Sequence, residues 1–420
     1  MKDQIEESLV IRSELPCGKK LVLSLDFFEW FRGFTDAEGS FIIVKGLGNG
    51  FSFHFVIRLH IDDKGVLDYI KKTLGLGTVT VSKTKPEVVF LVRIQDEIRV
   101  LLELFTKYPL NSSKHLNFLD FCKAFQLYTE NSSPQSRQEL RPEIEGIKNG
   151  MNSQRTDFSL PRTHYNITKY WLLGFLEGDG WFSFTLRTKT WEFGIAQKGN
   201  KALLEAIAEF LQNLASQDEL IYSENNNSSV ANIYPNKNLG DVYFMVIRRH
   251  IILEKLIIPI LDPLTWRTKK YLDYCDWKAI LNLCNKGFHY IPEGKDLIER
   301  ILNQMNSNRL STSKVPTIDR TLLHTEIVEL LSEPSNYDIR NGKKYIKSLG
   351  RHVRHEILNK ALAVQLIDLE SGNIIETFNS FNDCSKFLDI SRPTVSNRSL
   401  KGICFLYKGK SVYLKRVVKD

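Results

Sequence analysis

Residues 31–39 read FRGFTDAEG, and residues 172–180 read LLGFLEGDG. The two stretches align position by position: Gly33 falls on Gly174, and apolar residues occupy the first and fourth positions of both. An aromatic, strand-like run follows each copy. The offset between the copies is the length of a domain, which is too long for a solenoid repeat. The sequence therefore predicts two related halves, each built around one copy.

Small residues recur four positions apart in each copy, at Gly33 and Ala37 and at Gly174 and Gly178. Residues four apart share one face of a helix, and a row of small residues lets two helix backbones approach closely. If the two helices pack through these rows, their C-terminal ends lie side by side. The glycine after each acid is expected to end its helix in the left-handed conformation.

Glu38 and Asp179 end the two predicted helices and would become neighbours. Their pairing is unfavourable by itself, because a carboxylate at a helix C-terminus opposes the helix dipole. Two carboxylates ~4 Å apart also repel by ~4 kcal/mol at an effective dielectric constant of about 20. A divalent cation reverses both effects, and carboxylate and carbonyl oxygens favour Mg²⁺, Mn²⁺ or Ca²⁺. One acid-glycine pair alone is more typical of a solvated turn, and the duplication is what indicates a metal site.

Both copies resemble the LAGLIDADG motif of homing endonucleases in the single-chain form with two motifs. The resemblance spans roughly residues 20–285 and implies an α+β fold, with two pseudo-symmetric αββαββα repeats that form a DNA-binding saddle. It also implies Mg²⁺-dependent cleavage of double-stranded DNA, with Mn²⁺ as a substitute. The eighth position of the motif supplies the metal-binding acids, here Glu38 and Asp179. The carbonyl groups of Ala37 and Gly178 would help to hold the metal.

The resemblance divides the chain into six predicted parts. The segment between the repeats is polar and has too few large apolar residues for a core of its own. No function is predicted for the segment that follows the second repeat. The parts are an N-terminal lead (1–24), the first repeat (25–128), a linker (129–165), the second repeat (166–285), a bridge (286–360) and a modular DNA-binding domain (361–415).

Aligning the halves produces two further pairs. His60 falls on Gln197, each just before a predicted helix, and Lys114 falls on Lys270, each after a Pro-Leu pair. In the family, a polar residue at a strand end and a basic residue near this helix assist at the scissile phosphates, so the resemblance implies catalytic roles for these four. A lysine there would stabilise developing negative charge. The alternative for each lysine is an ordinary surface position.

Residues 51–60 alternate between apolar and polar side chains, which predicts a half-buried strand. The polar face carries donors suited to phosphates and to base edges in the major groove. Simple solvent exposure is the alternative for any one of these side chains. The predicted DNA contacts of the two repeats are Lys45, Ser52, His54, Arg58, Lys83, Arg93, Ser183, Thr185, Arg187 and Lys198.

The formal net charge of +8 arises entirely from residues 341–420, which hold 15 Lys or Arg and 7 Asp or Glu. A basic tail of this kind favours a polyanion as partner. Its two short predicted helices, 381–388 and 393–400, are separated by a short break and indicate a helix-turn-helix. The tail resembles the modular DNA-binding repeat often appended to homing nucleases, and a small capping module is the alternative. Its predicted DNA contacts are Arg392, Thr394, Ser396, Asn397 and Arg398.

The six cysteines form no CxxC pair and no zinc-ligand spacing, which indicates reduced thiols in a non-secreted protein. No apolar run reaches the ~18 residues of a membrane span, and the N-terminus has no signal-peptide pattern, so no membrane partner is expected. The resemblance to homing endonucleases implies an organelle-encoded protein, which would need no targeting segment, with the mitochondrion as the expected location and the chloroplast as second choice.

The leading hypothesis is an intron-encoded, site-specific endonuclease that acts on double-stranded DNA as a monomer. The alternative is a maturase, which would bind intron RNA with the same basic faces and help its own intron to splice. A DNA-binding regulator without chemistry is a third hypothesis. The acids in both motifs argue against it, because a regulator has no need of paired carboxylates.

Overall fold

The computed structural model describes residues 8–14, 20–48, 50–217, 229–236, 238, 240–353 and 362–418. Parts of the predicted lead, second repeat, bridge and module lie outside these residues, as does Cys17. The chain divides into two compact units, Met1–Ser335 and Asn336–Asp420. Among the described helices, none combines the length and the apolar character that crossing a membrane requires.

The first half of unit 1 begins with a hairpin and continues as a helix, two strands, a helix, two strands and two helices. Its antiparallel sheet has the order β3-β4-β6-β5, and β4 alternates buried phenylalanines with partly exposed polar residues at its start. The elements are β1 (Ser8–Glu14), β2 (Lys20–Ser24), α1 (Leu25–Glu38), β3 (Gly39–Lys45), β4 (Phe51–His60), η1 (Ile61–Asp63), α2 (Lys64–Leu74), β5 (Thr78–Val81), β6 (Glu87–Val92), α3 (Gln95–Lys107) and α4 (Lys114–Glu130).

The second half repeats this order, and its sheet has the matching order β7-β8-β10-β9. A π-helical turn, η4, interrupts the helix that corresponds to α3. The predicted α+β fold with two αββαββα repeats is therefore confirmed. The elements are α6 (Lys169–Asp179), β7 (Gly180–Thr185), β8 (Thr190–Lys198), α7 (Lys201–Ala215), β9 (Asn232–Pro235), β10 (Val242–Ile247), α9 (His250–Ile252), η4 (Leu253–Ile257), α10 (Ile258–Leu261) and α11 (Lys270–Asn285).

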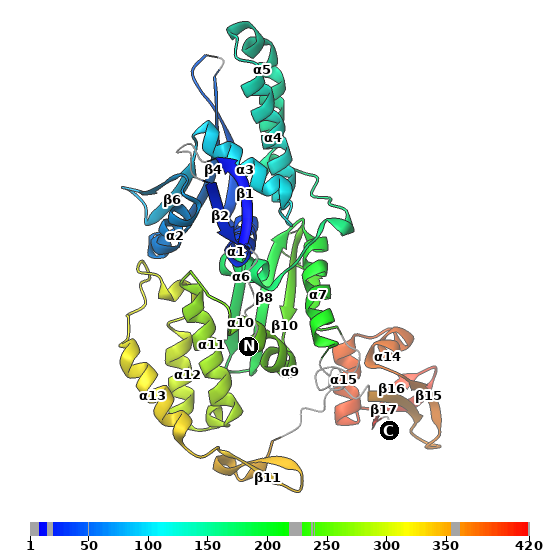
Figure 1. Cartoon of the computed structure of the whole chain (residues 1–420). Coiled ribbons are helices and arrows are strands. Elements are labelled where there is room, and N and C mark those ends of the chain that lie inside the picture. Colours follow the sequence, from blue (N-terminus) through cyan, green and yellow to red (C-terminus); the bar gives the residue numbers. More distant parts are fainter. Residues whose placement is uncertain are drawn as a thin grey trace. The chain divides into compact units, whose positions relative to one another are not determined.

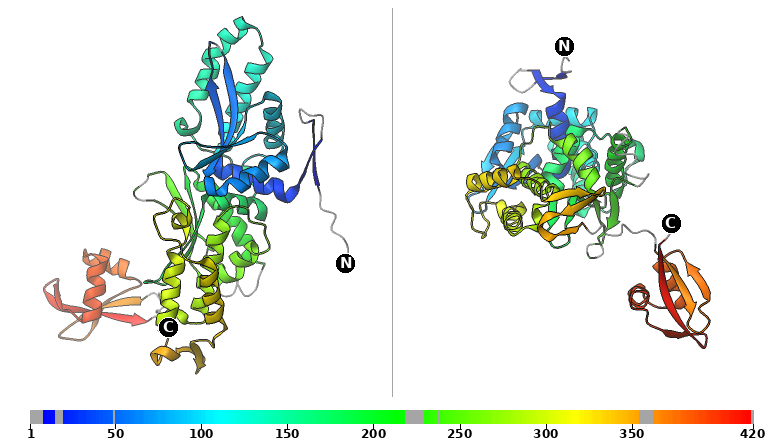
Figure 2. Two further views of the ribbon diagram at one scale, coloured as in Figure 1. Left: turned by 90° about the vertical axis from the view of Figure 1, so that its left-hand side faces the viewer. Right: turned by 90° about the horizontal axis from the view of Figure 1, so that it is seen from below.

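The motif helices α1 and α6 pack against each other at the centre of unit 1, between the two sheets (Figures 1 and 2). A Cβ atom on Gly33 would lie 2.0 Å from the carbonyl oxygen of Trp171, and one on Gly174 would lie 2.0 Å from that of Trp30. A side chain at either position would push the backbones apart, because close-packed interiors leave no room for it. The glycine rows therefore bring the two helices together as expected.

The glycines that follow the acids do not adopt the expected left-handed conformation. Gly39 has φ −70° and Gly180 has φ −81°, and each begins a strand directly. A Cβ atom on Gly39 would lie 2.8 Å from the carbonyl oxygen of Thr35, in the last turn of its own helix. Glycine is needed here because a side chain would collide with the last turn of the helix, and not because the backbone requires a positive φ.

The segments predicted to be a linker and the start of a bridge contain helices that pack on the repeats. Ile144 of α5 and Ile298 of α12 are buried in the same hydrophobic core as the motif helices. Both segments therefore extend the repeats instead of only connecting them. The elements are α5 (Pro134–Asn149), η2 (Asn152–Gln154), η3 (Arg162–His164), η5 (Phe288–Tyr290), α12 (Pro292–Leu302), η6 (Asn306–Arg309) and α13 (Arg320–Ser332).

Unit 2, drawn orange to red in Figure 2, has a small core of its own built around Val364, Cys384 and Leu414. A three-stranded sheet of residues 337–352 also belongs to this unit, although these residues were assigned to the predicted bridge and no sheet was expected there. The main sheet has the order β15-β14-β17-β16. The elements are β11 (Tyr337–Arg340), β12 (Lys343–Ile346), η7 (Lys347–Leu349), β13 (Arg351–His352), β14 (Leu362–Asp368), β15 (Ile374–Phe378), α14 (Phe381–Leu388), α15 (Arg392–Lys401), β16 (Phe405–Tyr407) and β17 (Lys410–Val418).

The helix pair of unit 2 has the expected break between α14 and α15. Asp389 ends α14 in the left-handed conformation with φ 51°. Ser391 begins α15, because its hydroxyl accepts a hydrogen bond from the amide of Thr394 at 3.3 Å. A serine cap followed by a proline in the first turn is a common helix start.

Candidate active site

The C-terminal ends of α1 and α6 bring Glu38 and Asp179 to the same end of the helix interface. A Cβ atom on Gly178 would lie 2.3 Å from the Cβ of Ala37 and 3.2 Å from Oε1 of Glu38. The two acid-bearing turns are therefore in van der Waals contact, and the carboxylates interact electrostatically.

Two lysines, one from each repeat, contact the C-terminal ends of α1 and α6. Nζ of Lys114 donates a hydrogen bond to the carbonyl oxygen of Ala37 at 2.5 Å. Nζ of Lys270 donates to the carbonyl oxygens of Gly178 at 3.1 Å and of Gly180 at 2.5 Å. Each lysine is the first residue of its helix, α4 or α11, and the two bonds to Ala37 and Gly178 are related by the pseudo-twofold symmetry.

These four ionisable groups are all partly buried, and desolvation is the largest cause of their pKa shifts. Burial raises the pKa of Asp179 to about 6; the Lys114 ammonium opposes this shift and the Glu38 carboxylate adds to it. Burial also raises the pKa of Glu38, against the opposing effect of Lys114 and Lys270. Burial lowers the pKa of both lysines, although the two acids counteract the shift. Additional positive charge here would stabilise both carboxylates.

The two strand-end residues, Gln197 and His60, line two different hollows near the paired acids. Nε2 of Gln197 donates a hydrogen bond to Oδ2 of Asp179 at 2.7 Å, and Gln197 lines a hollow together with Lys114. His60 lines a second hollow together with Glu38 and Lys270. The sequence alignment therefore brings each residue to the acids, although only Gln197 contacts one.

The sixth position of the first motif, Asp36, was not predicted to act at the site. Its carboxylate is buried and accepts hydrogen bonds from the amides of Asn111 at 2.8 Å and Ser112 at 2.7 Å. It also accepts one from Nε1 of Trp171, on the opposite motif helix, at 2.8 Å. Asp36 thus ties the helix pair to the loop that immediately precedes Lys114.

Glu177 joins the helix pair to the loop that precedes Lys270 in the second repeat. It accepts hydrogen bonds from the amides of Arg267 and Thr268, both at 2.6 Å, and from Nε1 of Trp30 at 2.5 Å. These amides immediately precede Lys270. Asp36 and Glu177 occupy equivalent positions of the two motifs, so a comparison of the copies could have identified them as a pair.

Each lysine-bearing helix also contacts the other repeat. Asp63 accepts a hydrogen bond from the amide of Lys269 at 2.8 Å, and Nδ2 of Asn200 donates to the hydroxyl of Ser113 at 3.1 Å. Asp63 and Asn200 follow the two strand-end residues by three positions. The cluster of Lys114 and Gln197 and the cluster of Lys270 and His60 are therefore each assembled from both repeats, which no local sequence pattern reveals.

The predicted DNA contacts of the first repeat are on the strands and turns of its sheet. The hydroxyl of Ser52 is hydrogen-bonded to Nε2 of His54 at 2.8 Å. Arg93 lies close enough to His54 to help lower its pKa, although burial is the larger cause. Lys45 is paired with Glu145 of α5 at 3.0 Å, and Arg58 lies 3.9 Å from Glu87. The exposed residues of the set are Lys45, Arg58, Lys83 and Arg93.

In the second repeat, Ser183 and Thr185 are on one side of β7, and Arg187 is exposed in the turn that follows. Lys198 is exposed at the end of β8 and lines the hollow that contains Lys114 and Gln197. Among the predicted contacts, the second repeat therefore has two exposed cations, Arg187 and Lys198, where the first repeat has four.

The predicted contacts of α15 fall into two groups. Arg392 and Asn397 are exposed, whereas Thr394 shares a hydrogen bond with the capping Ser391. The carbonyl oxygen of Ser396 accepts a hydrogen bond from Arg416 at 2.8 Å. The guanidinium group of Arg398 lies 4.3 Å from the centroid of the Phe405 ring, so Ser396 and Arg398 both contact the module's own sheet.

The donor set at the helix ends fits a hard divalent cation. It consists of the carboxylates of Glu38 and Asp179 and the carbonyl groups of Ala37 and Gly178, all oxygen donors. No group of three or more His, Cys, Asp or Glu side chains that could hold a metal ion occurs among the described residues, so a site here would depend on two carboxylates together with backbone carbonyl groups. Magnesium suits a site of few protein oxygens, because it usually keeps several water ligands.

Comparison with known proteins identifies the family. The family model "LAGLIDADG endonuclease" matches residues 31–125 and 172–281, one segment for each repeat. A crystal structure titled as the LAGLIDADG homing endonuclease I-GzeII in complex with its DNA target is similar over 67% of this chain and 99% of that chain, with 27% identity and a TM-score of 0.56. The chain belongs to the LAGLIDADG endonuclease family, in the form that carries two motifs.

Two curated relatives extend the comparison. The "Uncharacterized mitochondrial protein RF1" of Saccharomyces cerevisiae is 25% identical over 429 aligned residues, which cover 98% of this chain and 86% of that protein. The "Probable intron-encoded endonuclease Cox1-I1b" of Schizosaccharomyces pombe is 30% identical over 196 residues, or 44% of this chain and 50% of the relative. The chain therefore spans about half the length of the second relative.

Proposed function

We propose that this protein is a site-specific, metal-dependent endonuclease that makes a double-strand cut in DNA at an intron insertion site. The pairing of Glu38 with Asp179 at the joined helix ends, each beside a partly buried lysine, is the observation that carries the proposal. Family membership, relatives named as probable intron-encoded endonucleases and a DNA-bound structural neighbour support it.

In this proposal, Glu38 and Asp179 hold Mg²⁺ together with the carbonyl groups of Ala37 and Gly178, and Mn²⁺ can replace it. When bound, such an ion lowers the pKa of water and stabilises the leaving oxygen of a phosphodiester.

Lys114 and Lys270 stabilise the negative charge that develops on the two scissile phosphates. Gln197 orients Asp179 through its hydrogen bond, and His60 has the corresponding place in the other centre.

The open faces of the two sheets would bind the DNA on either side of the cut, with Lys45, Arg58, Lys83 and Arg93 as exposed cations of the first repeat. One chain supplies both acids, so a monomer suffices for a double-strand cut. Unit 2 would provide a further DNA contact through α15, mainly by Arg392 and Asn397. Phosphate contacts of this kind make binding weaker as the salt concentration rises.

The proposed location is the mitochondrion. One relative is described as mitochondrial and the other as intron-encoded, whereas neither name points to a chloroplast. No separate observation favours the maturase, because the features that would bind intron RNA are those that would bind DNA.

The test is cleavage of a pool of duplexes that carry a randomised central region, with Mg²⁺ and purified protein, followed by sequencing of the cut ends. The protein should cut both strands at one shared sequence, and chelation of the metal should stop the reaction. Glu38→Gln and Asp179→Asn should each abolish the double-strand cut. Full activity in both variants would refute the site assignment. A wild-type protein that cuts nothing but promotes splicing of an intron RNA would establish the maturase instead.

A further inference from the structure

A short sequence recurs outside the two motifs. Residues 151–155 read MNSQR and residues 305–309 read MNSNR, and each follows the extra helix, α5 or α12, that extends its repeat. The asparagines take up the same left-handed backbone conformation, with φ 55° at Asn152 and φ 56° at Asn306. We refer to residues 151–155 and 305–309 as the two MNS turns.

Each MNS turn is bound to the lysine-bearing helix of its own repeat. Arg155 donates from Nε to Oδ1 of Asn117 at 2.8 Å and from a second nitrogen to Asp120. The amide of Asn152 donates to the same Oδ1 atom at 2.9 Å. Asn117 follows Lys114 by three positions and is its neighbour on the surface of α4, and Asp120 follows Asn117 by three.

The second turn repeats these bonds atom for atom. Arg309 donates from Nε to Oδ1 of Asp273 at 2.8 Å and from a second nitrogen to Asp276. The amide of Asn306 donates to Oδ1 of Asp273 at 2.8 Å. Asp273 and Asp276 follow Lys270 by three and six positions, and Arg320 adds a further bond to Asp276 at 2.7 Å.

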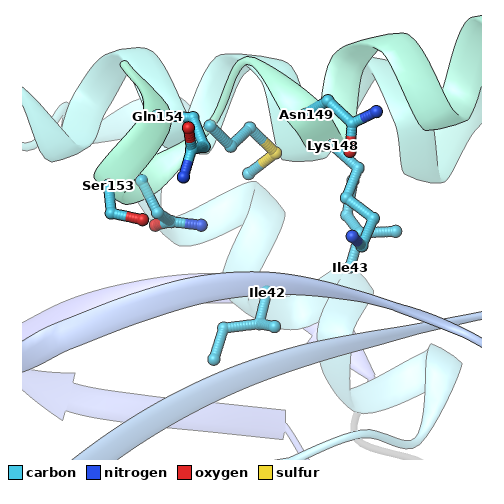
Figure 3. A pocket seen from close by; sticks show the side chains of 8 residues that line it. Ile42, Ile43, Lys148, Asn149, Ser153 and Gln154 are labelled. Carbon is cyan, nitrogen blue, oxygen red and sulfur yellow. The ribbon is translucent and has the colours of Figure 1, made fainter.

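From each turn the chain continues to the strand end of the opposite repeat. After the first turn, Phe158 packs on Gly199, where a Cβ atom would lie 2.5 Å from the ring, and it lines the hollow that contains Lys114 and Gln197. The turn itself lies over β3, and Figure 3 shows Ser153 and Gln154 on the far side of a pocket from Ile42.

After the second turn, the chain reaches His60 and the residues beside it. The hydroxyl of Thr312 is hydrogen-bonded to Nε2 of His60 at 3.1 Å, and the amide of Ser311 donates to Oδ2 of Asp62 at 2.7 Å. Leu310 lines the hollow that contains His60 and Lys270. Each turn therefore connects the lysine of one repeat to the strand-end residue of the other.

We propose that the two MNS turns are positioning elements, each of which holds one reaction centre in register across the two repeats. Arg155 positions the centre of Lys114 and Gln197, and Arg309 positions the centre of Lys270 and His60. The inference rests on the proposed function. It assigns a role to segments that lie largely outside the residues matched by the family model.

The physical reason is that a site assembled from two repeats loses rate when the side chains supplied by one repeat shift relative to those of the other. Charge-assisted hydrogen bonds from a guanidinium group with little exposure hold geometry more firmly than exposed ion pairs do. The side chains of Arg309 and Asp276 are 8% and 7% exposed. The segment that follows the second turn bonds to His60 through Thr312, whereas Gln197 has its own bond to Asp179, so loss of Arg309 should have the larger effect.

Hydrogen exchange tests the proposal without DNA, on the full-length Arg155→Ala and Arg309→Ala variants. Arg309→Ala should raise amide exchange at residues 57–66 and leave residues 194–203 unchanged, and Arg155→Ala should do the reverse. The matched control is Arg300→Ala, which removes an ion pair between α12 and α13 and touches neither hollow. Equal changes in both segments, or none beyond those in the control, would overturn the proposal.

Strand-resolved cutting supplies the second measurement, with a duplex recovered from the randomised pool and labelled on either strand. Each alanine variant should slow the cutting of one strand by about tenfold more than the other, because small displacements of reacting groups are costly. The slowed strand should differ between the two variants. Arg309→Lys keeps the charge and should recover part of the rate, and it replaces the alanine variant if that variant does not fold.

Equal slowing of both strands would contradict the positioning role. A wild-type protein that cuts no duplex would refute the proposed function, while the exchange experiment would still decide this inference.

Discussion

The centre that contains Lys114 and Gln197 and the centre that contains Lys270 and His60 share their main parts but differ in the last one. Both lysines donate to the carbonyl group that precedes an acid, at equivalent positions of the two repeats. Gln197 bonds to its acid, whereas His60 bonds to Thr312 of the second extension. The bonds from the lysines to backbone carbonyl groups are the same in both repeats. The bond made by the strand-end side chain differs, because that residue is Gln197 in one centre and His60 in the other.

The largest effect is expected from substitutions that disturb the packing of α1 on α6, because both centres depend on that packing. Gly33→Ala and Gly174→Ala should each lower the free energy of unfolding by at least about 3 kcal/mol, because the new methyl group would overlap a backbone carbonyl. Urea unfolding followed by circular dichroism would measure the loss.

Gly146→Ala on α5 is the matched control, since a Cβ atom there would meet nothing within 4 Å. It should leave stability unchanged or raise it by up to about 1 kcal/mol, as expected for glycine to alanine in a helix. A Gly174→Ala protein as stable as this control would contradict the close packing of α1 on α6.

Replacing the lysines should separate the two centres. Lys114→Met should slow one strand cut by about a hundredfold and Lys270→Met the other, because each removes positive charge from one scissile phosphate. Neither variant should lose much stability, since burial already disfavours the charged form of both lysines. Strand-labelled duplexes give the rates, and the same strand slowed in both variants would show that the centres are not separate.

Neutralising the sixth-position acids should weaken both repeats to a similar degree. Asp36→Asn and Glu177→Gln each remove the charge from a buried carboxylate that accepts two amides and an indole N–H. Each should lower the free energy of unfolding by about 2 kcal/mol, the cost of leaving buried donors poorly satisfied. Thermal unfolding is the measurement, and an unchanged midpoint in both would argue against the tie to the lysine-bearing loops.

The smallest effect on the cutting rate is expected from exchanging the strand-end residue, which is His60 in one centre and Gln197 in the other. His60→Gln should leave the fold intact and change the rate on its strand by only a few-fold, because the side chain of His60 contacts Thr312 and Asp62 rather than the paired acids Glu38 and Asp179. Gln197→His should cost more, since it removes the donor to Asp179. Rates on the two strands, compared for the two variants, check the order. A larger loss from His60→Gln would mean that His60 has a direct role in the reaction.

The parts of the site that the sequence predicted are those carried by local spacing. The duplicated motif identified Glu38 and Asp179 as the paired acids, and alignment of the halves identified both lysines and Gln197. The ties at Asp36 and Glu177 were not predicted, although the two residues align, because their partners are 75 to 147 positions away in the chain. The MNS turns were missed because their repeat is only five residues long and lies in segments that look like connections.

By itself, the sequence determined that the chain has two equivalent halves, that small residues line one face of each motif helix, and that an acid ends each helix. These features are periodic and local, so the order of residues is enough to recognise them. Only the tertiary structure decided that each centre is built from both repeats, that the extensions reach across to the opposite strand ends, and that His60 and Gln197 have different partners. Those contacts depend on how two packed helices orient whole sheets relative to each other, which short-range patterns do not encode.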